Sequence, residues 1–323
     1  MHVNVNNTIN EQIESIVKLV LSDYENNRDI DKMDVFTQPD RSVVIDILEK
    51  LLRIIFPGYY RDRNYKVYNN SYRLSMLVED VMYNLTKQIT IALRYRKDLE
   101  SLTADAIGEK AQCTSIAFFE KIPKIREYVS TDLMATFDGD PAADSRDDII
   151  LSYPGLLAST INRIAHELFL LKVPLIPRMM TEYAHSATGI DIHPGATIGK
   201  YLMMDHGTGI VVGSTSIIGE HVKIYQGVTI GALSTRGGQS LHGTKRHPTI
   251  EDNVTIYAGA SILGGETVIG HDSVIGSNAF ITSSVRPNTR VSMKMQDLQY
   301  KDDKGHIIHK EGTDEGEFWT YSI

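Results

Sequence analysis

The stretch "VVGSTSIIGEHVKIYQGVTIG", residues 211–231, carries an aliphatic residue at every sixth position. These anchors are Val212, Ile218, Ile224 and Ile230, and glycine follows three of them. A period of six fits neither the 3.6 residues of a helical turn nor the two-residue alternation of a strand. It fits a chain that coils through three short flat faces, with one anchor of each face pointing inward. We therefore predict a parallel β-helix.

The same spacing covers most of the chain beyond Gly189. Small or β-branched residues lie two positions before most anchors, and glycine helps the backbone turn the corners. The other anchors are Ile192, Ile198, Met204, Ile250, Ile256, Ile262, Ile269, Ile275 and Ile281. Stacked coils with inward anchors bury one apolar column. An antiparallel β-sandwich with accidental spacing is the alternative, and repetition over this length disfavours it.

The segment before Gly189 has a helical rhythm instead. In "YRLSMLVEDVMYNLTKQITIAL", residues 72–93, apolar residues recur every three or four positions. Further helices are predicted over 9–24, 41–56, 105–128 and 154–171. The predicted fold class is α+β, with an α-helical domain over 1–188, a left-handed β-helix over 189–291 and a flexible tail over 292–323.

Composition narrows the functional classes. The chain has 323 residues and a formal net charge of −8, which disfavours nucleic acid and anionic membrane as partners. Its one cysteine, Cys113, allows no internal disulfide. No apolar run approaches the roughly 20 residues of a membrane span, and the start of the sequence lacks the pattern of a signal peptide. We expect a cytoplasmic protein.

The six-residue repeat breaks in three places, with steps of eight, twenty and seven residues between anchors. The eight-residue step follows Met204, and the twenty-residue step follows Ile230. Insertions in repeat proteins become loops, often on the binding face. The two largest breaks contain Asp205-His206 and Arg246-His247, each a histidine beside a charged residue. These positions are the first candidates for a site.

Several motifs together resemble one family. "DIHPGATIG" (191–199), "MMDHGTGIVVG" (203–213), "QGVTIGA" (226–232) and "KRHPTI" (245–250) occur in the order found in serine O-acetyltransferases. Upstream, "DPAAD" (140–144) and "GLLASTINRIAH" (155–166) resemble the helical segment that leads into the β-helix of that family. The resemblance covers about residues 138–285 and implies acetyl transfer from acetyl-CoA to the hydroxyl of L-serine, which gives O-acetylserine for cysteine biosynthesis.

The resemblance also implies roles for individual residues. His206 matches the general base, and Asp191 matches the carboxylate that orients it. Asp140 and Asp205 match the acids that bind the amino group of serine. The remaining matches are Arg246 for the serine carboxylate, His247 beside it, and Gly231, Ala258 and Ser277 along bound coenzyme A.

The chemistry supports these roles independently. A serine hydroxyl needs a base near neutral pH, and an unperturbed histidine titrates at about 6.5. A carboxylate on the other ring nitrogen fixes the tautomer and stabilises the imidazolium. The zwitterionic substrate needs acids for its ammonium and an arginine for its carboxylate. No nucleophilic cysteine or serine–histidine elbow lies near these motifs, so direct transfer is favoured over an acyl-enzyme.

Two other activities remain possible on the sequence alone. A zinc lyase of the β-helix carbonic anhydrase type would bind zinc with three histidines across a trimer interface, and His206, His242 and His247 are the available set. A sugar or antibiotic O-acetyltransferase would share the repeat, but the "DPAAD" and "KRHP" motifs argue against it. We expect no metal. A purely structural role explains the repeat but not the paired charges.

The resemblance finally implies partners. β-Helices of this class form trimers with the active site between neighbours, and the helical half can pair trimers into hexamers. L-cysteine would act as a feedback inhibitor if it occupied the serine subsite. In the family, a terminal isoleucine is captured by O-acetylserine sulfhydrylase (cysteine synthase), and this sequence ends in Ile323. A terminal carboxylate suits capture by backbone N–H groups.

Overall fold

The computed structural model describes residues 5–32, 34, 37–60, 70–293, 300–301 and 307–308. The chain divides into two compact units. Unit 1 contains Met1–Ser130 and Ala158–Ala187, and unit 2 contains Thr131–Leu157 and Thr188–Ile323. Residues 131–157 therefore cluster with the β-helix, although they precede the boundary predicted at 188–189. The predicted tail and Ile323 lie almost entirely outside the described residues.

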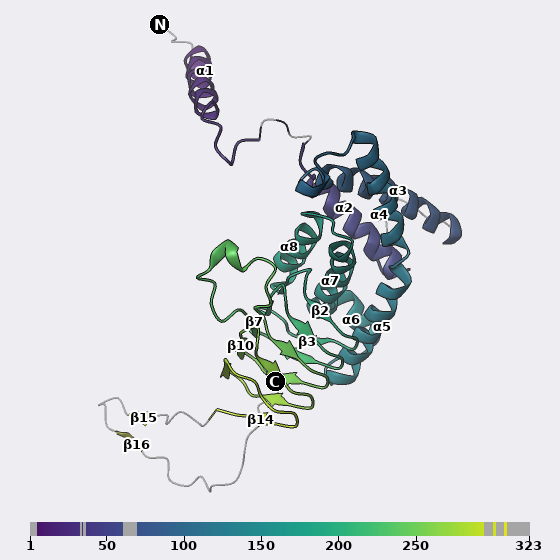
Figure 1. Ribbon diagram of the computed structural model, residues 1–323, viewed down its shortest axis with the longest axis vertical. Coiled ribbons are helices and arrows are strands. Elements are labelled where there is room, and N and C mark those ends of the chain that lie inside the picture. Colours follow the sequence, from purple (N-terminus) through teal and green to yellow (C-terminus); the bar gives the residue numbers. More distant parts are fainter. Residues whose placement is uncertain are drawn as a thin grey trace. The chain divides into compact units, whose positions relative to one another are not determined.

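Helices occupy the described chain up to residue 188 (Figure 1). They are α1 (Val5–Tyr24), α2 (Arg41–Ile55), α3 (Asn70–Leu93), the 3-10 helix η2 (Lys97–Leu99), α4 (Ala104–Phe119), α5 (Ile122–Gly139), α6 (Arg146–Ser152), α7 (Pro154–Leu170) and α8 (Ile176–Thr188). None of the helices in the described part of the chain is both long and apolar enough to cross a membrane.

The single helix predicted over 105–128 is wrong, because the chain turns at Glu120 and Lys121 between α4 and α5. Pro123 explains the break. Proline lacks a backbone N–H, and its ring clashes with the carbonyl four residues earlier, so it is tolerated only in the first turn of a helix. Helices α6 and α8 were also not predicted. They are short, and prolines follow α6 and flank the start of α8.

The core of unit 1 forms where helical periodicity predicts it. Helix α3 packs against α2 and α4. On α2, Val44, Ile47, Leu48 and Leu51 are fully buried and recur at three- and four-residue spacing. Asp40 caps the start of α2 by accepting hydrogen bonds from two backbone N–H groups of the first turn.

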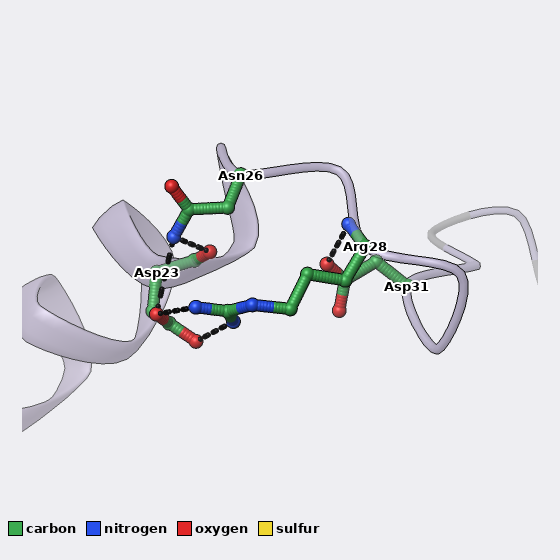
Figure 2. Close-up of polar contacts among 4 residues, drawn as sticks. All are labelled: Asp23, Asn26, Arg28 and Asp31. Carbon is green, nitrogen blue, oxygen red and sulfur yellow. Dashed lines mark hydrogen bonds and ion pairs between the residues drawn. The ribbon is translucent and has the colours of Figure 1, made fainter.

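Polar contacts link the last turn of α1 to the chain that follows it (Figure 2). The Arg28 guanidinium donates to both carboxylate oxygens of Asp23, at 2.5 and 2.8 Å. Asn26 donates to the same carboxylate, and the backbone N–H of Arg28 donates to Asp31. Ion pairs this exposed contribute little to stability, so these contacts define the local turn rather than a core.

Unit 2 contains a parallel β-helix of three sheets, which the chain visits in turn (Figure 1). Sheet A contains β1 (Asp191–Ile192), β4 (Val211–Val212), β7 (Thr229–Gly231), β10 (Ser261–Leu263) and β13 (Phe280–Ile281). Sheet B contains β2 (Thr197–Ile198), β5 (Ile217–Ile218), β8 (Thr249–Ile250) and β11 (Val268–Ile269). Sheet C contains β3 (Met203–Asp205), β6 (Lys223–Tyr225), β9 (Thr255–Ile256), β12 (Val274–Ile275) and β14 (Arg290–Val291).

Every predicted anchor is buried, with an exposed fraction of 9% or less. Anchors of successive coils are direct partners: Val212 lies opposite Ile230, which lies opposite Ile262. Burying one such side chain stabilises a fold by roughly 1.5–3 kcal/mol. The six-residue spacing thus produces the continuous apolar column that it predicts.

Two corners of the β-helix matter for function. At the C–A corner the chain passes from sheet C to sheet A, as it does after β3, β6, β9 and β12. At the A–B corner it passes from sheet A to sheet B, as it does after β4, β7 and β10. The eight-residue step lies at the C–A corner. The twenty-residue step lies at the A–B corner and contains the 3-10 helix η3 (Gly238–Leu241).

Candidate active site

His206 lies at the C–A corner, directly after β3. Its φ is +54°, in the left-handed region, and that of Gly207 is +81°. A Cβ on Gly207 would collide with the side chain of Ile190 in the coil below. The glycine therefore lets this enlarged corner lie close to its neighbour, and the corner presents His206 outward with 53% of its side chain exposed.

Asp205 ends β3 and lies beside the imidazole. Its Oδ2 is 3.8 Å from Nε2 of His206, and its side chain is only 13% exposed. A carboxylate that is poorly solvated interacts more strongly with a nearby charge than an exposed one does. An imidazolium formed at His206 would therefore be stabilised by Asp205.

Asp191 begins β1, in the coil below His206. Its backbone pairs with Val211, and its N–H donates to the carbonyl of Ile210, 2.9 Å away. The N–H of Gly209 donates to the carbonyl of Gly189. The chain around Asp191 therefore runs alongside the corner that carries His206, across neighbouring coils as the sequence predicts.

Asp140 follows the end of α5 and is half-buried. Its Oδ1 accepts the N–H of Ala142 at 2.8 Å, and its Oδ2 accepts the hydroxyl of Tyr153 at 2.6 Å. The hydrogen bond to Asp140, with some burial, raises the pKa of Tyr153 to about 12. The negative charge of Asp205 contributes to the same shift. The carboxylates of Asp140 and Asp205 therefore both lie close enough to the Tyr153 hydroxyl to raise its pKa.

Close backbone contacts bring Asp140 and Tyr153 to β3. A Cβ on Gly139 would collide with the side chain of Met203, and one on Gly155 would collide with the carbonyl of Met204. In addition, the 1%-exposed carboxylate of Asp132 accepts the N–H of Leu202 at 3.0 Å. Two glycines and one buried aspartate thus assemble the acidic part of the site around Asp205.

Arg246 and His247 lie at the A–B corner, where they interlock with the turn after β4. The Nη2 of Arg246 donates to Oγ of Ser214 at 2.9 Å. Backbone N–H groups of Arg246 and His247 both donate to Oγ1 of Thr215, at 3.0 and 3.1 Å. These bonds fix the position at which the chain rejoins the β-helix after the twenty-residue step.

Lys245 strengthens the same attachment. Its ammonium donates to the carbonyl oxygens of Thr215, His247 and Pro248. An ammonium has three donors, and here each reaches a main-chain carbonyl. Burial lowers the pKa of Lys245. The lysine therefore fastens the segment that carries Arg246.

The ring of His247 is buried and its tautomer is set by its partners. Nδ1 accepts the backbone N–H of Thr215 at 3.1 Å, so the neutral ring carries its proton on Nε2. Burial, followed by the charges of Arg246 and Lys245, lowers the pKa of His247 to about 4. His247 is therefore a neutral hydrogen-bond donor at physiological pH rather than a base.

The predicted residues thus form two groups in one chain. Asp140, Asp205 and His206 lie at or beside the C–A corner, and Asp191 begins β1 in the coil below, whereas Arg246 and His247 belong to the A–B corner. Residues 210–213, which include β4, separate the two corners, and extended chain rises about 3.3 Å per residue. The two groups are therefore on the order of 10 Å or more apart along sheet A, and one chain does not bring them together.

The residues predicted to contact coenzyme A also lie at both ends of sheet A. Ala258 and Ser277 lie in successive turns stacked at the C–A corner, where the N–H of Asn278 donates to the carbonyl of Ala258. Gly231 ends β7 and lies opposite Leu263 at the other end of sheet A. Ala258 and Ser277 therefore share the corner of His206, and Gly231 does not.

A cavity of about 270 Å³ adjoins the second group. Lys245, Arg246 and Glu266 contribute its charged lining, beside Leu233 and the turn Gly264–Gly265. It lies between the twenty-residue step and the turn after β10. The long loop therefore leaves room beside Arg246.

The three histidines of the zinc hypothesis do not converge in one chain. His206 and His247 occupy different corners, and His247 uses Nδ1 to accept a backbone N–H. His242 lies at the end of η3 within the loop. A tetrahedral zinc site needs its nitrogens within about 2.1 Å of one ion, so a site built from these histidines would need more than one copy of the chain.

Five side chains that hold the site were not predicted: Asp132, Tyr153, Ser214, Thr215 and Lys245. Tyr153 lies in a Tyr-Pro-Gly turn, which predicts a helix start but not a contact with Asp140. Thr215 carries no signal of its own. Lys245 is adjacent to Arg246 in the motif, and this adjacency was the available clue.

A parallel β-helix that displays a histidine and carboxylates at one corner is the architecture of the hexapeptide-repeat acyltransferases. No family model matches the sequence. The chain is 39% identical over 225 residues to the plasmid serine acetyltransferase of Synechococcus elongatus, covering 68% of this chain and 70% of that protein. It is 45% identical over 125 residues to the serine acetyltransferase of Bacillus subtilis, covering 39% and 55%.

Solved structures of serine acetyltransferases also resemble this chain. Serine acetyltransferase isoform 3 of Entamoeba histolytica, in complex with cysteine, superimposes with a TM-score of 0.67 at 35% identity, covering 80% of this chain and 84% of that one. The enzyme of Neisseria gonorrhoeae, in complex with serine, gives a TM-score of 0.51 at 27% identity, covering 77% and 95%. The chain belongs to the serine acetyltransferase family, and its fold is the left-handed β-helix of that family.

Proposed function

We propose that this protein transfers the acetyl group of acetyl-CoA to the hydroxyl of L-serine, giving O-acetylserine for cysteine biosynthesis. Membership of the family supports the reaction. The observation that carries it in this chain is the group at the C–A corner: an outward-facing imidazole 3.8 Å from Asp205, with Asp140 and Asp205 both acting on Tyr153. That group suits a substrate with a hydroxyl and an ammonium on neighbouring carbons.

His206 is the general base in this proposal. It takes the proton of the serine hydroxyl as the oxygen attacks the thioester carbonyl of acetyl-CoA. The tetrahedral intermediate then collapses, the carbon–sulfur bond breaks, and the proton passes from the imidazolium to the leaving thiolate. General-base help of this kind contributes about 10²–10⁴-fold. Asp205, 3.8 Å from Nε2, stabilises the imidazolium between the two steps, and Asp191 orients the ring.

The substrate's charged groups are matched separately. Asp140 and Asp205 bind the ammonium. Arg246 binds the carboxylate, and His247, whose neutral ring carries its proton on Nε2, donates a hydrogen bond beside it. A carboxylate accepts readily from a guanidinium and a fixed N–H.

Because one chain places these two groups at different corners, the complete site needs a second copy. We propose a homotrimer in which the A–B corner of one copy faces the C–A corner of the next. Cyclic assembly repeats the same interface at each neighbour, so three equivalent sites result. Pairing of trimers into a hexamer is compatible with this arrangement.

Acetyl-CoA is the acyl donor in this proposal. The stacked turns of Ala258 and Ser277 lie above His206 at the same corner, which supports placing the pantetheine arm along them. Gly231 lies at the far end of sheet A, so a contact with it would come from the site of another copy.

L-cysteine has the ammonium and carboxylate of serine, with a thiol in place of the hydroxyl. We propose that it inhibits by occupying the same subsites. One of the related structures is a complex with cysteine. Inhibition that is not competitive with serine would count against this assignment. We also propose that O-acetylserine sulfhydrylase captures the C-terminal segment through Ile323.

The reaction is tested by following the release of free coenzyme A from acetyl-CoA. Purified protein is assayed with L-serine, L-homoserine, a sugar panel and no acceptor. Release that depends on L-serine supports the proposal. Release only with a sugar, or stoichiometric zinc with hydratase activity, would establish one of the alternatives instead.

A further inference from the structure

Both carboxylate oxygens of Asp140 already carry a donor. Oδ1 accepts the N–H of Ala142 at 2.8 Å, and Oδ2 accepts the hydroxyl of Tyr153 at 2.6 Å. Donors on separate oxygens fix the plane of the carboxylate, and each oxygen keeps a second lone pair. Asp140 can therefore receive an ammonium without losing either bond.

Tyr153 is suited to remain a donor. Its pKa is raised to about 12 by the hydrogen bond to Asp140, by burial, and by the charges of Asp140, Asp148 and Asp205. The phenol is therefore un-ionised at neutral pH. It places a donor among three acids without adding to their negative charge, which a fourth ionised group would do.

The backbone places Tyr153 independently of Asp140. The N–H of Tyr153 donates to the carbonyl of Ile149 at the end of α6, and Pro154 begins α7 immediately afterwards. Gly155 then lies against the carbonyl of Met204, one residue before Asp205. The phenol is thus fixed relative to Asp205, whereas Asp140 lies in the connection between α5 and α6. The hydrogen bond transmits this position to Asp140.

We propose that Tyr153 is a positioning residue for the amino-group subsite: it holds the Asp140 carboxylate in register with Asp205, so that both acids reach one ammonium. The inference rests on the proposed function, because it assigns how this subsite is built. It also predicts selectivity, since a subsite with two aligned acids favours hydroxy compounds that carry an α-ammonium over those that lack one.

The test compares wild type with Tyr153→Phe, which removes only the hydroxyl. The acceptors are L-serine and 3-hydroxypropanoate, which lacks the amino group. Loss of one hydrogen bond to a charged group should raise KM for L-serine about tenfold. The kcat and the KM for acetyl-CoA should stay within about twofold of wild type, because Asp140 is assigned to the ammonium of the substrate and not to the imidazole or to acetyl-CoA. The preference for L-serine over 3-hydroxypropanoate should fall by the same factor as the KM rises.

Two further variants make the result decisive. Tyr201→Phe is the matched control, because Tyr201 stacks on His221 at the corner between sheets B and C. It should behave as wild type. In an Asp140→Asn background, Tyr153→Phe should add no more than about twofold, because the partner whose position it sets is gone. The melting temperature of each variant reports its folding separately from its kinetics.

The outcomes separate the inference from the proposed function. An unchanged KM for L-serine in Tyr153→Phe, with an active wild type, overturns the inference and leaves the reaction intact. Equal losses with both acceptors, or full additivity with Asp140→Asn, would show a general structural role and also overturn it. A wild type that does not acetylate L-serine removes the proposed function, and this inference with it.

Discussion

The carboxylate of Asp205 lies 3.8 Å from Nε2 of His206, at the end of a strand whose partner in the next coil is β6. The carboxylate is largely buried and the imidazole is largely exposed. One acid can therefore serve two cations: the ammonium of the bound substrate and the imidazolium that forms beside it during transfer. This gives Asp205 a larger expected effect than a residue that only binds substrate.

Substitution of the two candidate acids should separate their roles. Asp205→Asn should lower kcat and raise KM for L-serine, with kcat/KM reduced by about 10²-fold or more, because both cations lose their partner. Asp191→Asn should lower kcat with little change in KM, because it affects only the orientation of the ring. Steady-state kinetics with both substrates distinguish the patterns. If Asp191→Asn changed both kcat and KM while Asp205→Asn changed kcat alone, the roles assigned to Asp191 and Asp205 would have to be exchanged.

If the site is shared between copies, co-expression of two inactive variants should restore part of the enzymatic activity. His206→Ala and Arg246→Ala should each be nearly inactive alone. Co-expressed and assembled at random, one interface in four pairs an intact His206 with an intact Arg246, so activity should return to roughly a quarter of wild type. Mixing the purified variants without exchange of subunits is the control. If co-expression restores nothing, the complete site lies within one chain.

The buried ring of His247 predicts a loss of stability in acid. Its pKa is about 4 in the folded protein and close to 6.5 when unfolded, so the unfolded chain binds the proton more tightly. The stability it contributes is fully present above pH 6.5 and is lost as the pH falls toward 4. The difference corresponds to about 3 kcal/mol at most.

Denaturant titrations at pH 7.5 and pH 5 measure this effect. The unfolding free energy of wild type should fall between these pH values by more than that of His247→Gln, which has no proton to gain. The same fall in both proteins would show that another group is responsible.

Gly155 should tolerate no side chain. A Cβ there would collide with the carbonyl of Met204, and overpacking of this kind costs about 1–3 kcal/mol. Gly155→Ala should therefore lower the melting temperature and weaken binding of L-serine, because it displaces Tyr153 and Asp205. Gly108→Ala is the matched control. A Cβ at Gly108, within α4, meets nothing within 4 Å, and this change should stabilise the helix by roughly 0.5–1 kcal/mol. Equal effects of the two substitutions would contradict the packing argument.

Deletion of Ile323 should abolish co-purification with O-acetylserine sulfhydrylase, because the isoleucine side chain would be lost and the terminal carboxylate would move back to Ser322. Release of coenzyme A by the shortened protein should be unchanged, which is the control for folding. Retained co-purification would show that the partner binds elsewhere or that the tail is not recognised.

The β-helix could be predicted from sequence because its period is carried by single residues. Every anchor from Ile192 to Ile281 is buried, since each coil repeats the same inward position. The same regularity placed the His206 corner beside Asp191. Helix boundaries were less predictable: the break at Pro123 required weighing one proline against a long periodic pattern, and Pro174 and Pro177 flank the start of α8.

The tertiary contacts of the site escaped prediction for a different reason. Gly155, which comes two residues after Tyr153, lies against the main chain of β3, and glycine by itself does not indicate which strand will approach it. The separation of Arg246 from His206 also depends on where the twenty-residue step rejoins the coil, which spacing alone leaves open.

The role of His206 as the base is tested most directly by the rate of coenzyme A release by His206→Asn, with L-serine and acetyl-CoA both saturating. The asparagine side chain keeps a polar group at this corner but cannot accept the hydroxyl proton. We predict that kcat falls by about 10²–10⁴-fold, while the variant still binds L-serine with an affinity close to that of wild type by calorimetry. An undiminished kcat in the folded variant would contradict the assignment of His206 as the base, and with it the mechanism proposed for this chain.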